Sequence, residues 1–527
     1  MRFYITTPIY YVNSTPHIGH AYTTIAADIL TRHHRQRGDE TFFLTGVDEH
    51  ADKVARVAAE QGLAPKEYAD RIVVAWQELP RRLNATNDFF IRTSDEGHGR
   101  FVQEFLQRIK ENGREDIYAD VYAGWYCVGC EEFKTPEELV DGKCPIHGVP
   151  AEWLEEKNWF FRLSAYQERL LELYDSRPDF VLPQFRSNEA RSFIEGGLRD
   201  FSISRATQTW GVPIPWDPDQ VAYVWADALV NYLSALSYAK PGEDLTRFWP
   251  ATHFLAKDIL RFHCVYWPAL LLAAGYEPPK QLFVHGYLNI DEKKISKSLG
   301  NIIDPLDLID TYGADAVRFW CARAVQFGQD GNVTLDSFHE RYERELGNDL
   351  GNLVSRTTAM VDRYRSGTLT ESDAQPPWDA DALRGELVAR LDRFDVTNAL
   401  DAIWQAVRRL NQYVEETAPW QLAKDDARAG VGSTEPDGGG AGSAGAGAEK
   451  SAELDGVLYH LVDGLTAIAV AVSPYLPESA PRILAALGQD ADDLSLERVR
   501  PRSARAATGI GPAAPLFPRV ELPTAAS

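Results

Sequence analysis

The chain has 527 residues, more than one hydrophobic core supports, so we expect roughly two to four domains. Hydrophobic residues make up 44% and charged residues 25%, and no apolar run nears the ~18 residues of a membrane span, so we expect a cytoplasmic protein with no signal peptide and no membrane contact. The 54 basic and 77 acidic residues give a formal charge of −23, which argues against indiscriminate binding of polyanions, so a nucleic-acid partner would need local basic patches.

The first stretch of the chain predicts a strand, a turn and a helix. Phe3–Val12 is rich in β-branched and aromatic residues, and residues 21–32 carry apolar side chains at helical spacing. His17 and His20 lie at the start of this helix, where unpaired backbone N–H groups and the helix dipole favour an anion. Gly19 lets a ligand approach the backbone closely. A nucleotide phosphate fits these features, although an H-x-x-H pair alone is more often surface or core histidine.

A second strand is predicted at Thr41–Val47, and Asp48 follows directly. In parallel α/β sheets ligands collect at the carboxyl ends of the strands, so Asp48 is predicted to be a ligand-facing carboxylate. The alternative is that Asp48 caps the helix predicted through residues 54–59. Further helices are predicted at Pro65–Arg82 and His98–Glu111.

Between Ile117 and Asn158 the pattern changes to short strands and turns, and three of the five cysteines lie there. Cys127 and Cys130 form a C-x2-C knuckle, and Cys144 and His147 form a C-x2-H knuckle. Three thiolates and one imidazole at this spacing predict a tetrahedral zinc site rather than disulfides. Four protein ligands close the coordination sphere, so the Zn²⁺ ion is predicted to be structural.

The parallel sheet is expected to resume at Asp200–Arg205. Gln220–Tyr232 and Ala251–Trp267 each predict a strand followed by a helix, and Gln281–His285 predicts a strand. Four side chains of the first passage share one helical face, which is typical of a core: Trp225, Ala228, Leu229 and Tyr232.

A lysine cluster follows in Asp291–Asn301, which reads DEKKISKSLGN. Lys293, Lys294 and Lys297 are three of only 14 lysines in the chain. A solvated basic loop is the usual interpretation of such a cluster. Here the neighbouring serines and glycine favour a mobile loop that carries point charges to a polyphosphate.

The chain is helical by pattern from about Thr334 onward, with breaks at Pro376, Pro377 and Pro419. Residues 430–448 are low in complexity and nearly free of large apolar groups, so they are predicted to form a flexible insert between two helices. The tail at residues 511–527 is predicted to be irregular.

HIGH at the start of the first helix and KISKS in the lysine loop, with an α/β pattern between them, resemble the two signatures of class I aminoacyl-tRNA synthetases. The wider set resembles the bacterial methionyl-tRNA synthetase family across nearly the whole chain. Its motifs occur in the expected order: TTPIYYVNSTPHIGHAYTT, FLTGVDEH, CVGC, CPIHG, YVWADAL, KDILRFH, NDLGNLVSR and NQYVEETAPW.

The resemblance implies an α/β Rossmann-type parallel-sheet catalytic domain with a small zinc-bearing insertion, followed by an all-α anticodon-binding helical domain. The expected divisions are the two catalytic halves at 1–116 and 159–290, the insertion at 117–158, the lysine loop and connecting segment at 291–333, and the helical domain at 334–510.

The resemblance also implies the activity of a methionine–tRNA ligase. ATP, accompanied by Mg²⁺, activates L-methionine to methionyl-adenylate and pyrophosphate, and the methionyl group then passes to the 3′ end of initiator and elongator tRNA(Met). A carboxylate is already a nucleophile at neutral pH, so the first step needs alignment and charge stabilisation rather than a general base. The expected cofactor is one structural Zn²⁺, and the expected state is a monomer.

Roles are implied for the residues that match family motifs. His17 and His20 would donate to the α-phosphate region, and Lys294 and Lys297 would close over the β- and γ-phosphates. Adenosine contacts and ATP binding fall to Gly19, Asp258 and His285. Asp48 would hold the amino group of methionine. The walls of the methionine pocket would be Ile9, Tyr11, Trp225, Ala228, Leu229, Tyr232, Phe262 and His263. Arg205 would support the lysine loop, and the anticodon readers would be Asn352, Arg356 and Trp420, although Trp420 alone is typical of helix packing.

The chain departs from the family pattern at three positions: Ile295 stands for Met, and Ala256 and Ala51 each stand for Gly. Ala256 can crowd the ribose or shift the ligand. With only two methionines in the chain, these departures leave open a divergent second copy that resists synthetase inhibitors, although compositional drift is the simpler interpretation. The sequence also leaves open an adenylating enzyme that does not use tRNA and a tRNA-binding scaffold with a dead active site.

Overall fold

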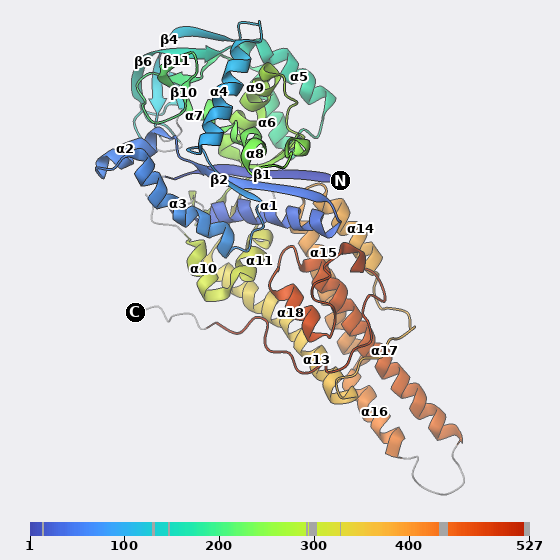
Figure 1. Cartoon of the computed structure of the whole chain (residues 1–527). Helices are drawn as coiled ribbons and strands as arrows, with labels where there is room; N and C mark the ends of the chain where they lie inside the picture. The colour runs from blue at the N-terminus through green and yellow to red at the C-terminus, as the bar shows by residue number, and fades with distance from the viewer. Residues whose placement is uncertain are drawn as a thin grey trace. The chain divides into compact units, whose positions relative to one another are not determined.

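A computed structural model describes residues 1–12, 15–128, 132–145, 148–290, 293–294, 303–326, 328–431 and 441–520 (Figure 1). The chain divides into two compact units. Unit 1 comprises Met1–Thr31, Glu40–Tyr287 and Ile302–Asp304, and unit 2 comprises Arg32–Asp39, Leu288–Asn301 and Pro305–Ser527.

Unit 1 is built on a six-stranded parallel sheet with the order β3-β2-β1-β12-β13-β7. Its strands are β1 (Arg2–Tyr11), β2 (Glu40–Asp48), β3 (Phe89–Arg92), β7 (Val181–Leu182), β12 (Thr252–Ala256) and β13 (Gln281–His285). From β1 the chain first adds strands on one side, β2 and then β3, and later adds β12 and β13 on the other. The carboxyl ends of β1 and β12 therefore flank a topological switch point, where open α/β sheets bind ligands.

Helices cover both faces of this sheet, which is why its central strands are nearly continuous runs of buried residues. Helix α1 (Ile18–Gln36) lies along one face, and α4 (Glu96–Lys110), α8 (Asn231–Tyr238) and α9 (Trp267–Ala274) lie on the other (Figure 1). The other α-helices described in unit 1 are α2 (Asp52–Glu60), α3 (Pro65–Arg82), α5 (Gln167–Ser176), α6 (Gln184–Glu195) and α7 (Val224–Ala228).

The register of β1 against β2 brings functional positions together. It shifts between Thr6 and Ile9, so one extra residue bulges from β1 around Pro8, which has no N–H for the ladder. Beyond the bulge Tyr11 pairs with Asp48 at the carboxyl ends of the two strands. Gly46 lies in this stretch, and a Cβ there would meet the carbonyl oxygen of the neighbouring strand at 2.1 Å. Only glycine therefore lets the three strands approach as they do.

Two smaller antiparallel sheets complete unit 1. One has the order β5-β4-β6-β8, and the other has the order β10-β11-β9. Their strands are β4 (Ile117–Cys127), β5 (Glu132–Lys134), β6 (Glu152–Phe161), β8 (Phe201–Ser202), β9 (Ser204–Arg205), β10 (Pro213–Ile214) and β11 (Asp217–Ala222).

Two expectations for this region are wrong. The parallel sheet does not resume at residues 200–205, because β8 pairs antiparallel with β6 and β9 pairs antiparallel with β11. The insertion is also not made of short strands alone, because β4 and β6 have 11 and 10 residues and pair over nearly their whole length. Strands β4 and β6 form a long antiparallel pair that belongs to a sheet separate from the parallel one.

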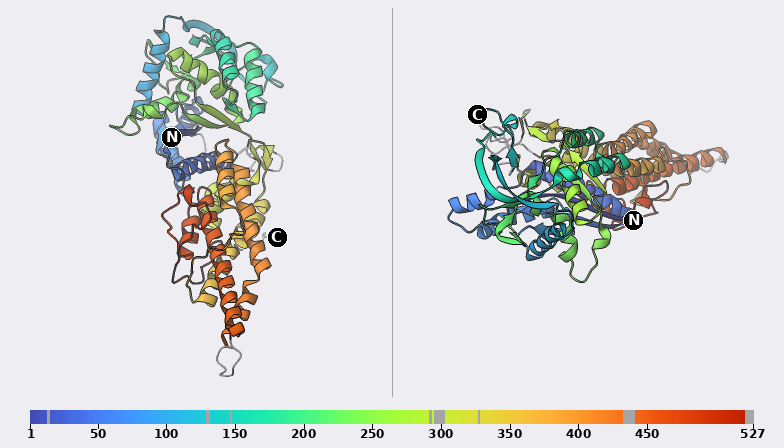
Figure 2. Two further views of the ribbon diagram at one scale, coloured as in Figure 1. Left: turned by 90° about the vertical axis from the view of Figure 1, so that its right-hand side faces the viewer. Right: turned by 90° about the horizontal axis from the view of Figure 1, so that it is seen from above.

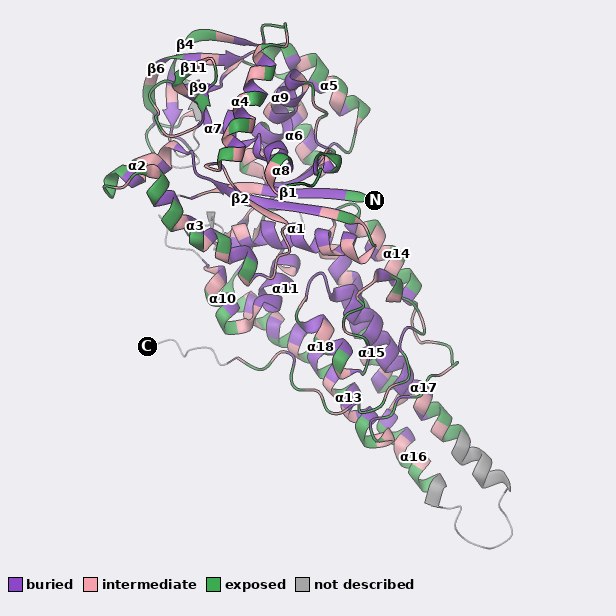
Figure 3. Ribbon diagram, in the orientation of Figure 1, coloured by how far each residue is buried: buried purple, intermediate pink, exposed green. Residues whose placement is uncertain are grey.

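Unit 2 is mainly helical. Helices α15 (Val396–Thr417) and α17 (Ala441–Val472) run side by side in all views (Figures 1 and 2), and their buried residues form much of its core (Figure 3). Its other helices are α10 (Pro305–Tyr312), α11 (Ala314–Ala324), α12 (Leu335–Arg341), a π-helix at Tyr342–Gly351, α13 (Asn352–Arg365), α14 (Ala380–Leu391), α16 (Pro419–Val431) and α18 (Ser479–Ala486). A small sheet joins β15 (Lys293–Lys294), β14 (Leu288–Ile290) and β16 (Gly331–Asn332).

Helix α17 differs from two expectations: the flexible insert at residues 430–448, and the absence of an apolar run of membrane-spanning length. It begins at Ala441, and α16 continues to Val431, so the segment expected to be an unstructured insert at 430–448 is helical at both ends. Residues 432–440 lie outside the described part of the chain. Residues 449–472 are also long and apolar enough to cross a membrane, with mean hydropathy 1.4. Because 94% of the most apolar window is buried inside the protein, this segment is a core helix.

Candidate active site

The two histidines at the start of α1 contact each other, with ring centroids 3.8 Å apart. Nδ1 of His20 accepts the backbone N–H of His17 at 3.1 Å, and Nδ1 of His17 accepts the backbone N–H of Gly19 at 3.1 Å. Because each Nδ1 is an acceptor, each neutral ring carries its proton on Nε2. The turn therefore orients two Nε2–H donors at the N-terminus of the helix.

Gly19 within the turn and the rings of Tyr10 and Trp76 beside it fix the position of the two histidines. A Cβ at Gly19 would lie 2.9 Å from Cε1 of His17, so a side chain there would displace the ring. Tyr10 and Trp76 each meet the His20 ring in a T-shaped contact, at centroid distances of 4.8 and 4.7 Å. Neither residue was predicted from the sequence. Tyr10 stands next to a predicted pocket residue, but Trp76 is spaced as an ordinary core residue of α3 and carries no signal of this role.

The chain returns to the histidine turn directly after the lysine loop. The backbone N–H of Ile18 donates to the carbonyl oxygen of Ile303 at 3.1 Å. Lys294 lies in β15, where its backbone pairs with Asn289. The Lys294 side chain and all of Lys297 fall outside what the structure describes.

His285 lies at the carboxyl end of β13 and contacts α1. Its Nδ1–H donates to the carbonyl oxygen of Gly286 at 2.8 Å, so Nε2 accepts the hydroxyl of Thr23 at 2.9 Å. Burial lowers the pKa of His285 to about 4, which keeps the ring neutral. Asp258 is exposed in the turn after β12, whose last residue Ala256 pairs with His285. The two predicted adenosine contacts thus come from neighbouring strand ends.

Five of the predicted methionine-pocket residues form one aromatic cluster. Trp225 and Phe262 stack at 3.8 Å with an interplanar angle of 6°, and Tyr11 meets Trp225 edge-on at 6.4 Å. The cluster is completed by Tyr232 and His263, and it includes the π-helical segment that runs from Phe262 to Tyr266, a form of helix often found at functional sites. Ile9 and Leu229 pack in the same core, and Ala228 is buried at the end of α7.

His263 is neutral and fixed in one tautomer. Its Nδ1–H donates to the carbonyl oxygen of Ile259 at 3.0 Å, so its Nε2 accepts the hydroxyl of Tyr232 at 2.7 Å. Burial lowers the pKa of His263 to about 4. The cluster is therefore an uncharged aromatic wall, which suits an apolar side chain.

Asp48 is a buried carboxylate at the carboxyl end of β2, with 2% of its surface exposed. Its Oδ1 accepts the backbone N–H of His50 at 3.2 Å and the hydroxyl of Thr93 at 3.4 Å. Burial, followed by the nearby charge of Asp227, raises the pKa of Asp48 to about 7. The alternative that Asp48 caps α2 is wrong, because Ala51 occupies the N-cap position.

The departures from the family pattern at Ala51 and Ala256 do not strain the backbone. Ala51 has φ −70° and Ala256 has φ −83°, values that any L-residue adopts. Ile295 lies outside the described residues.

Two of the four predicted zinc ligands are described. Cys127 ends β4 and Cys144 lies in a turn, and both side chains are fully buried. The N–H of Gly148 donates to the carbonyl oxygen of Cys144 at 2.7 Å. Cys130 and His147 lie in segments that the structure leaves undescribed. Among the residues that the structure does describe, no group of three or more possible metal ligands is found.

Arg205 is buried and paired within unit 1. Its Nε donates to Oε2 of Glu156 at 3.0 Å, and its guanidinium lies 4.4 Å from the ring centroid of Tyr126. The hydroxyl of Thr207 also donates to Glu156. Arg205 thus joins β9 to the strand that closes the insertion.

The predicted anticodon residues gather at one part of unit 2. Asn352 and Arg356 lie on α13, which packs against α16, and Trp420 lies in the first turn of α16 with 38% of its surface exposed. Nη2 of Arg356 forms an ion pair with Oε1 of Glu415 at 2.8 Å. An exposed indole and an exposed guanidinium on two helices that pack together are groups that can stack on and hydrogen-bond to unpaired bases.

The family described as class I tRNA synthetases (M) matches residues 3–150 and 134–358. The chain is 41% identical to the methionine–tRNA ligase of Caldanaerobacter subterraneus, over 99% of this chain and 79% of that protein. It is 42% identical to the methionine–tRNA ligase of Streptomyces coelicolor, over 93% of this chain and 90% of that protein.

Among solved structures, Mycobacterium tuberculosis methionyl-tRNA synthetase in complex with methionyl-adenylate has a TM-score of 0.89 and 38% identity, over 98% of this chain and 100% of that chain. The apo form of the same enzyme has a TM-score of 0.82. These likenesses confirm the resemblance drawn from the motifs and the expected parallel-sheet fold with a helical C-terminal region. The chain belongs to the methionyl-tRNA synthetase family of class I aminoacyl-tRNA synthetases.

Proposed function

We propose that this chain is a methionine–tRNA ligase that activates L-methionine with ATP and transfers the methionyl group to tRNA(Met). The observation that carries the proposal is the likeness, over nearly the whole chain, to a synthetase solved with methionyl-adenylate. Methionine-dependent exchange of pyrophosphate into ATP, run across a panel of amino acids, tests the first step. Transfer of methionine to a tRNA with a CAU anticodon tests the second and separates a synthetase from a tRNA-independent activator.

In the first step a carboxylate oxygen of methionine attacks the α-phosphorus of ATP, and the bond from that phosphorus to the oxygen bridging to the β-phosphate breaks. His17 and His20 would donate Nε2–H to the α-phosphate, and Lys294 and Lys297 would neutralise the leaving pyrophosphate. Magnesium arrives with ATP as part of the substrate. In the second step a ribose hydroxyl at the 3′ end of tRNA attacks the carbonyl carbon of the adenylate, and AMP leaves.

The amino acid would lie between the aromatic cluster and Asp48. The neutral pair of Tyr232 and His263, with Trp225 and Phe262, offers an apolar wall that matches an unbranched, polarizable thioether. Asp48 would pair with the substrate's ammonium group. Gly19, Asp258 and His285 would contact ATP, and Arg205 would support the lysine loop.

A structural Zn²⁺ held by Cys127, Cys130, Cys144 and His147 fits the insertion. The two described cysteines are fully buried in a segment that is otherwise rich in charged residues, and buried thiolates need a cation. The ion would cross-link the two knuckles and supply no step of the reaction.

The purified protein is expected to contain about one zinc ion per chain, measured by plasma mass spectrometry. Cys144→Ser is expected to lose most of that metal, because serine is a poor zinc ligand. Cys264→Ser is the matched control, since Cys264 is equally buried in unit 1 but lies outside the insertion. Wild-type zinc content in the Cys144→Ser protein would contradict the assignment.

Anticodon recognition is proposed for Asn352, Arg356 and Trp420. Trp420→Ala is expected to raise the KM for tRNA by roughly 5- to 150-fold, because a base that stacks on tryptophan gains about 1–3 kcal/mol. Pyrophosphate exchange should not change, since that step needs no tRNA. Leu335→Ala serves as the control, because Leu335 is a comparably exposed apolar residue of unit 2. Equal tRNA KM values for both variants would remove Trp420 from the interface.

We propose a cytoplasmic monomer that makes no membrane contact. For its organisation we propose the catalytic halves at 1–116 and 159–290, the insertion at 117–158, the connecting segment at 291–333 and the anticodon-binding domain at 334–510. The acidic overall charge of −23 supports tRNA contacts that are local rather than spread over the surface. The inhibitor-resistant second copy and the tRNA-independent activator are not favoured.

A further inference from the structure

A buried carboxylate beside the amino-acid pocket has no role in the proposed reaction. Asp227 lies in α7, two residues after Trp225, and is fully buried. Its Oδ2 contacts Nδ1 of His50 at 2.6 Å, and its Oδ1 contacts Nε2 of His98 at 2.7 Å. Nδ1 of His98 in turn contacts the hydroxyl of Ser234 at 2.7 Å. One carboxylate therefore ties the loop after β2 to α4 and α8.

His50 is the part of this network nearest to the predicted ammonium site. It lies two residues after Asp48, and its backbone N–H donates to Oδ1 of Asp48 at 3.2 Å. Its ring meets Trp210 edge-on at 5.0 Å, and the Trp210 indole N–H donates to the carbonyl oxygen of Glu49. The ring and the backbone of His50 thus hold two sides of the same short loop.

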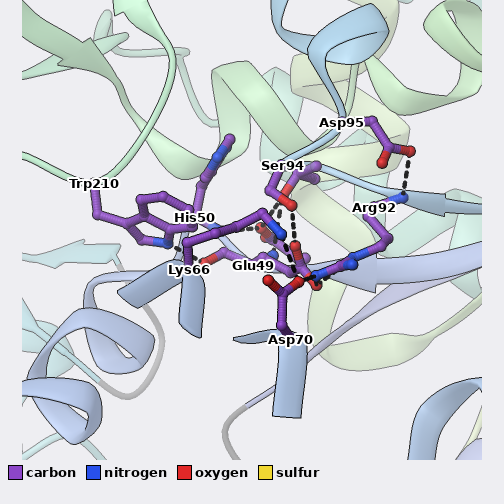
Figure 4. A network of polar contacts seen from close by, with 10 residues as sticks. Glu49, His50, Lys66, Asp70, Arg92, Ser94, Asp95 and Trp210 are labelled. Atoms are coloured by element: carbon purple, nitrogen blue, oxygen red, sulfur yellow. Dashed lines mark hydrogen bonds and ion pairs between the residues drawn. The ribbon is translucent and has the colours of Figure 1, made fainter. Parts of the chain in front are cut away.

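Glu49, the middle residue of this loop, is held by a different set of hydrogen bonds (Figure 4). The Glu49 carboxylate accepts Nε of Arg92 at 2.8 Å and the hydroxyl of Ser94. Arg92 also pairs with Asp70 on α3. Glu49 is therefore neutralised by residues from β3 and its following turn, which leaves Asp227 and His50 as the charge pair that acts on Asp48.

Asp48 interacts electrostatically with groups on α7, on its own loop and on α8. Asp227 comes from α7 and raises the pKa of Asp48, and His50 on the loop itself lowers it. Glu49 on the loop is paired with Arg92, and Tyr232 on α8 is a neutral phenol whose pKa is raised by burial. Burial disfavours the charged His50 ring, but the nearby carboxylates, Asp227 first and then Asp48 and Glu49, together outweigh burial, so the pKa of His50 is raised. The pair Asp227 and His50 is thus an ion pair next to Asp48.

We propose that Asp227 is a positioning residue for amino-acid activation: by holding the His50 ring it fixes the loop that aims the Asp48 carboxylate at the substrate's ammonium group. This inference rests on the proposed function, because it requires Asp48 to bind that ammonium. A structural tie between α7 and α4 would use the same hydrogen bonds but would not couple the charge of Asp227 to methionine binding.

The test compares the single variants His50→Gln and Asp227→Asn with the double variant. Each is measured on the full-length protein by methionine-dependent pyrophosphate exchange between pH 6 and pH 9. His50→Gln keeps a donor to Asp227 but removes the cation, so Asp48 faces an uncompensated negative charge. On the acid side of the pH profile, kcat/KM for methionine falls as Asp48 becomes protonated, and we call this part of the profile the acid limb. In His50→Gln we expect the acid limb to move to higher pH by about half a unit or more. The KM for ATP should change less than about twofold, since the hydrogen bonds described for the network run to β3, α4, α7 and α8.

Asp227→Asn removes the negative charge instead. We expect the acid limb of kcat/KM for methionine not to move to higher pH. We expect the KM for methionine to rise about threefold to tenfold at pH 8.5, because the His50 ring is no longer held by a carboxylate. The double variant should bring the limb back toward that of the wild type, because both charges are gone. Ser234→Ala is the matched control: it breaks the far end of the same buried network and should leave the pH profile of methionine unchanged.

Thermal unfolding by circular dichroism identifies variants that fail to fold, and His50→Gln alone still decides the matter if Asp227→Asn does not fold. If His50→Gln leaves the limb in place, or changes the KM values for methionine and ATP alike, the positioning role is overturned. A failure of the proposed function looks different, because then the wild-type protein itself would show no methionine-dependent exchange.

Discussion

Asp48→Asn is expected to raise the KM for methionine by roughly 150- to 5,000-fold while the KM for ATP stays within about threefold. The substitution keeps the shape of the side chain and removes its charge. Breaking a buried ion pair by neutralising one partner leaves the other charge uncompensated, which costs about 3–5 kcal/mol. The measurement is pyrophosphate exchange with each substrate varied in turn.

The same carboxylate predicts the pH dependence. In the free protein the pKa of Asp48 is raised to about 7, mainly by burial, so below that pH the group is protonated and cannot pair with an ammonium. We expect kcat/KM for methionine to fall about tenfold per unit as pH drops below this value, since this parameter reports ionisation in the free enzyme. The limb should vanish in Asp48→Asn.

Asp52→Asn is a close control for this pair of expectations. Asp52 lies four residues further on, in the first turn of α2, and pairs with Arg56 rather than with the pocket. Its replacement should leave both the KM for methionine and the acid limb unchanged. If Asp48→Asn behaved like Asp52→Asn, the ammonium partner would have to be another group.

Local signals predicted the elements and motif positions well. The strand Gln281–His285 and the helix Pro65–Arg82 have the expected bounds, because apolar periodicity and a proline at the first helical position act within a few residues. The position of Asp48 at the end of a parallel strand followed from the same local pattern together with the rule for open α/β sheets.

Partners distant in the sequence were not predictable. Strands β8 and β9 have two residues each, too few to show which neighbour they pair with, so their place outside the parallel sheet depends on tertiary packing. His98 lies 129 positions from Asp227 in the sequence. The local pattern around each residue predicts a helix but no partner for its side chain. Only the fold shows that the two share a buried hydrogen bond.

Replacements of His20 are expected to have the second large effect, and two of them separate the ring's two nitrogens. Nδ1 accepts the backbone N–H of His17, and Nε2–H is the proposed donor to the α-phosphate. Asparagine places an oxygen near the position of Nδ1 but has no group at Nε2. Glutamine places its amide nitrogen near Nε2 but leaves the His17 N–H without its acceptor.

His20→Asn is therefore expected to lower kcat for pyrophosphate exchange by roughly 100- to 1,000-fold, the usual loss when one donor to a developing charge is removed, with the KM for methionine little changed. His20→Gln should retain clearly more activity than His20→Asn. If the ring served only to fold the turn, the order would reverse, because asparagine preserves the structural hydrogen bond and glutamine does not. The order of the two variants thus decides whether Nε2 acts on the reacting phosphate or Nδ1 merely holds the helix start.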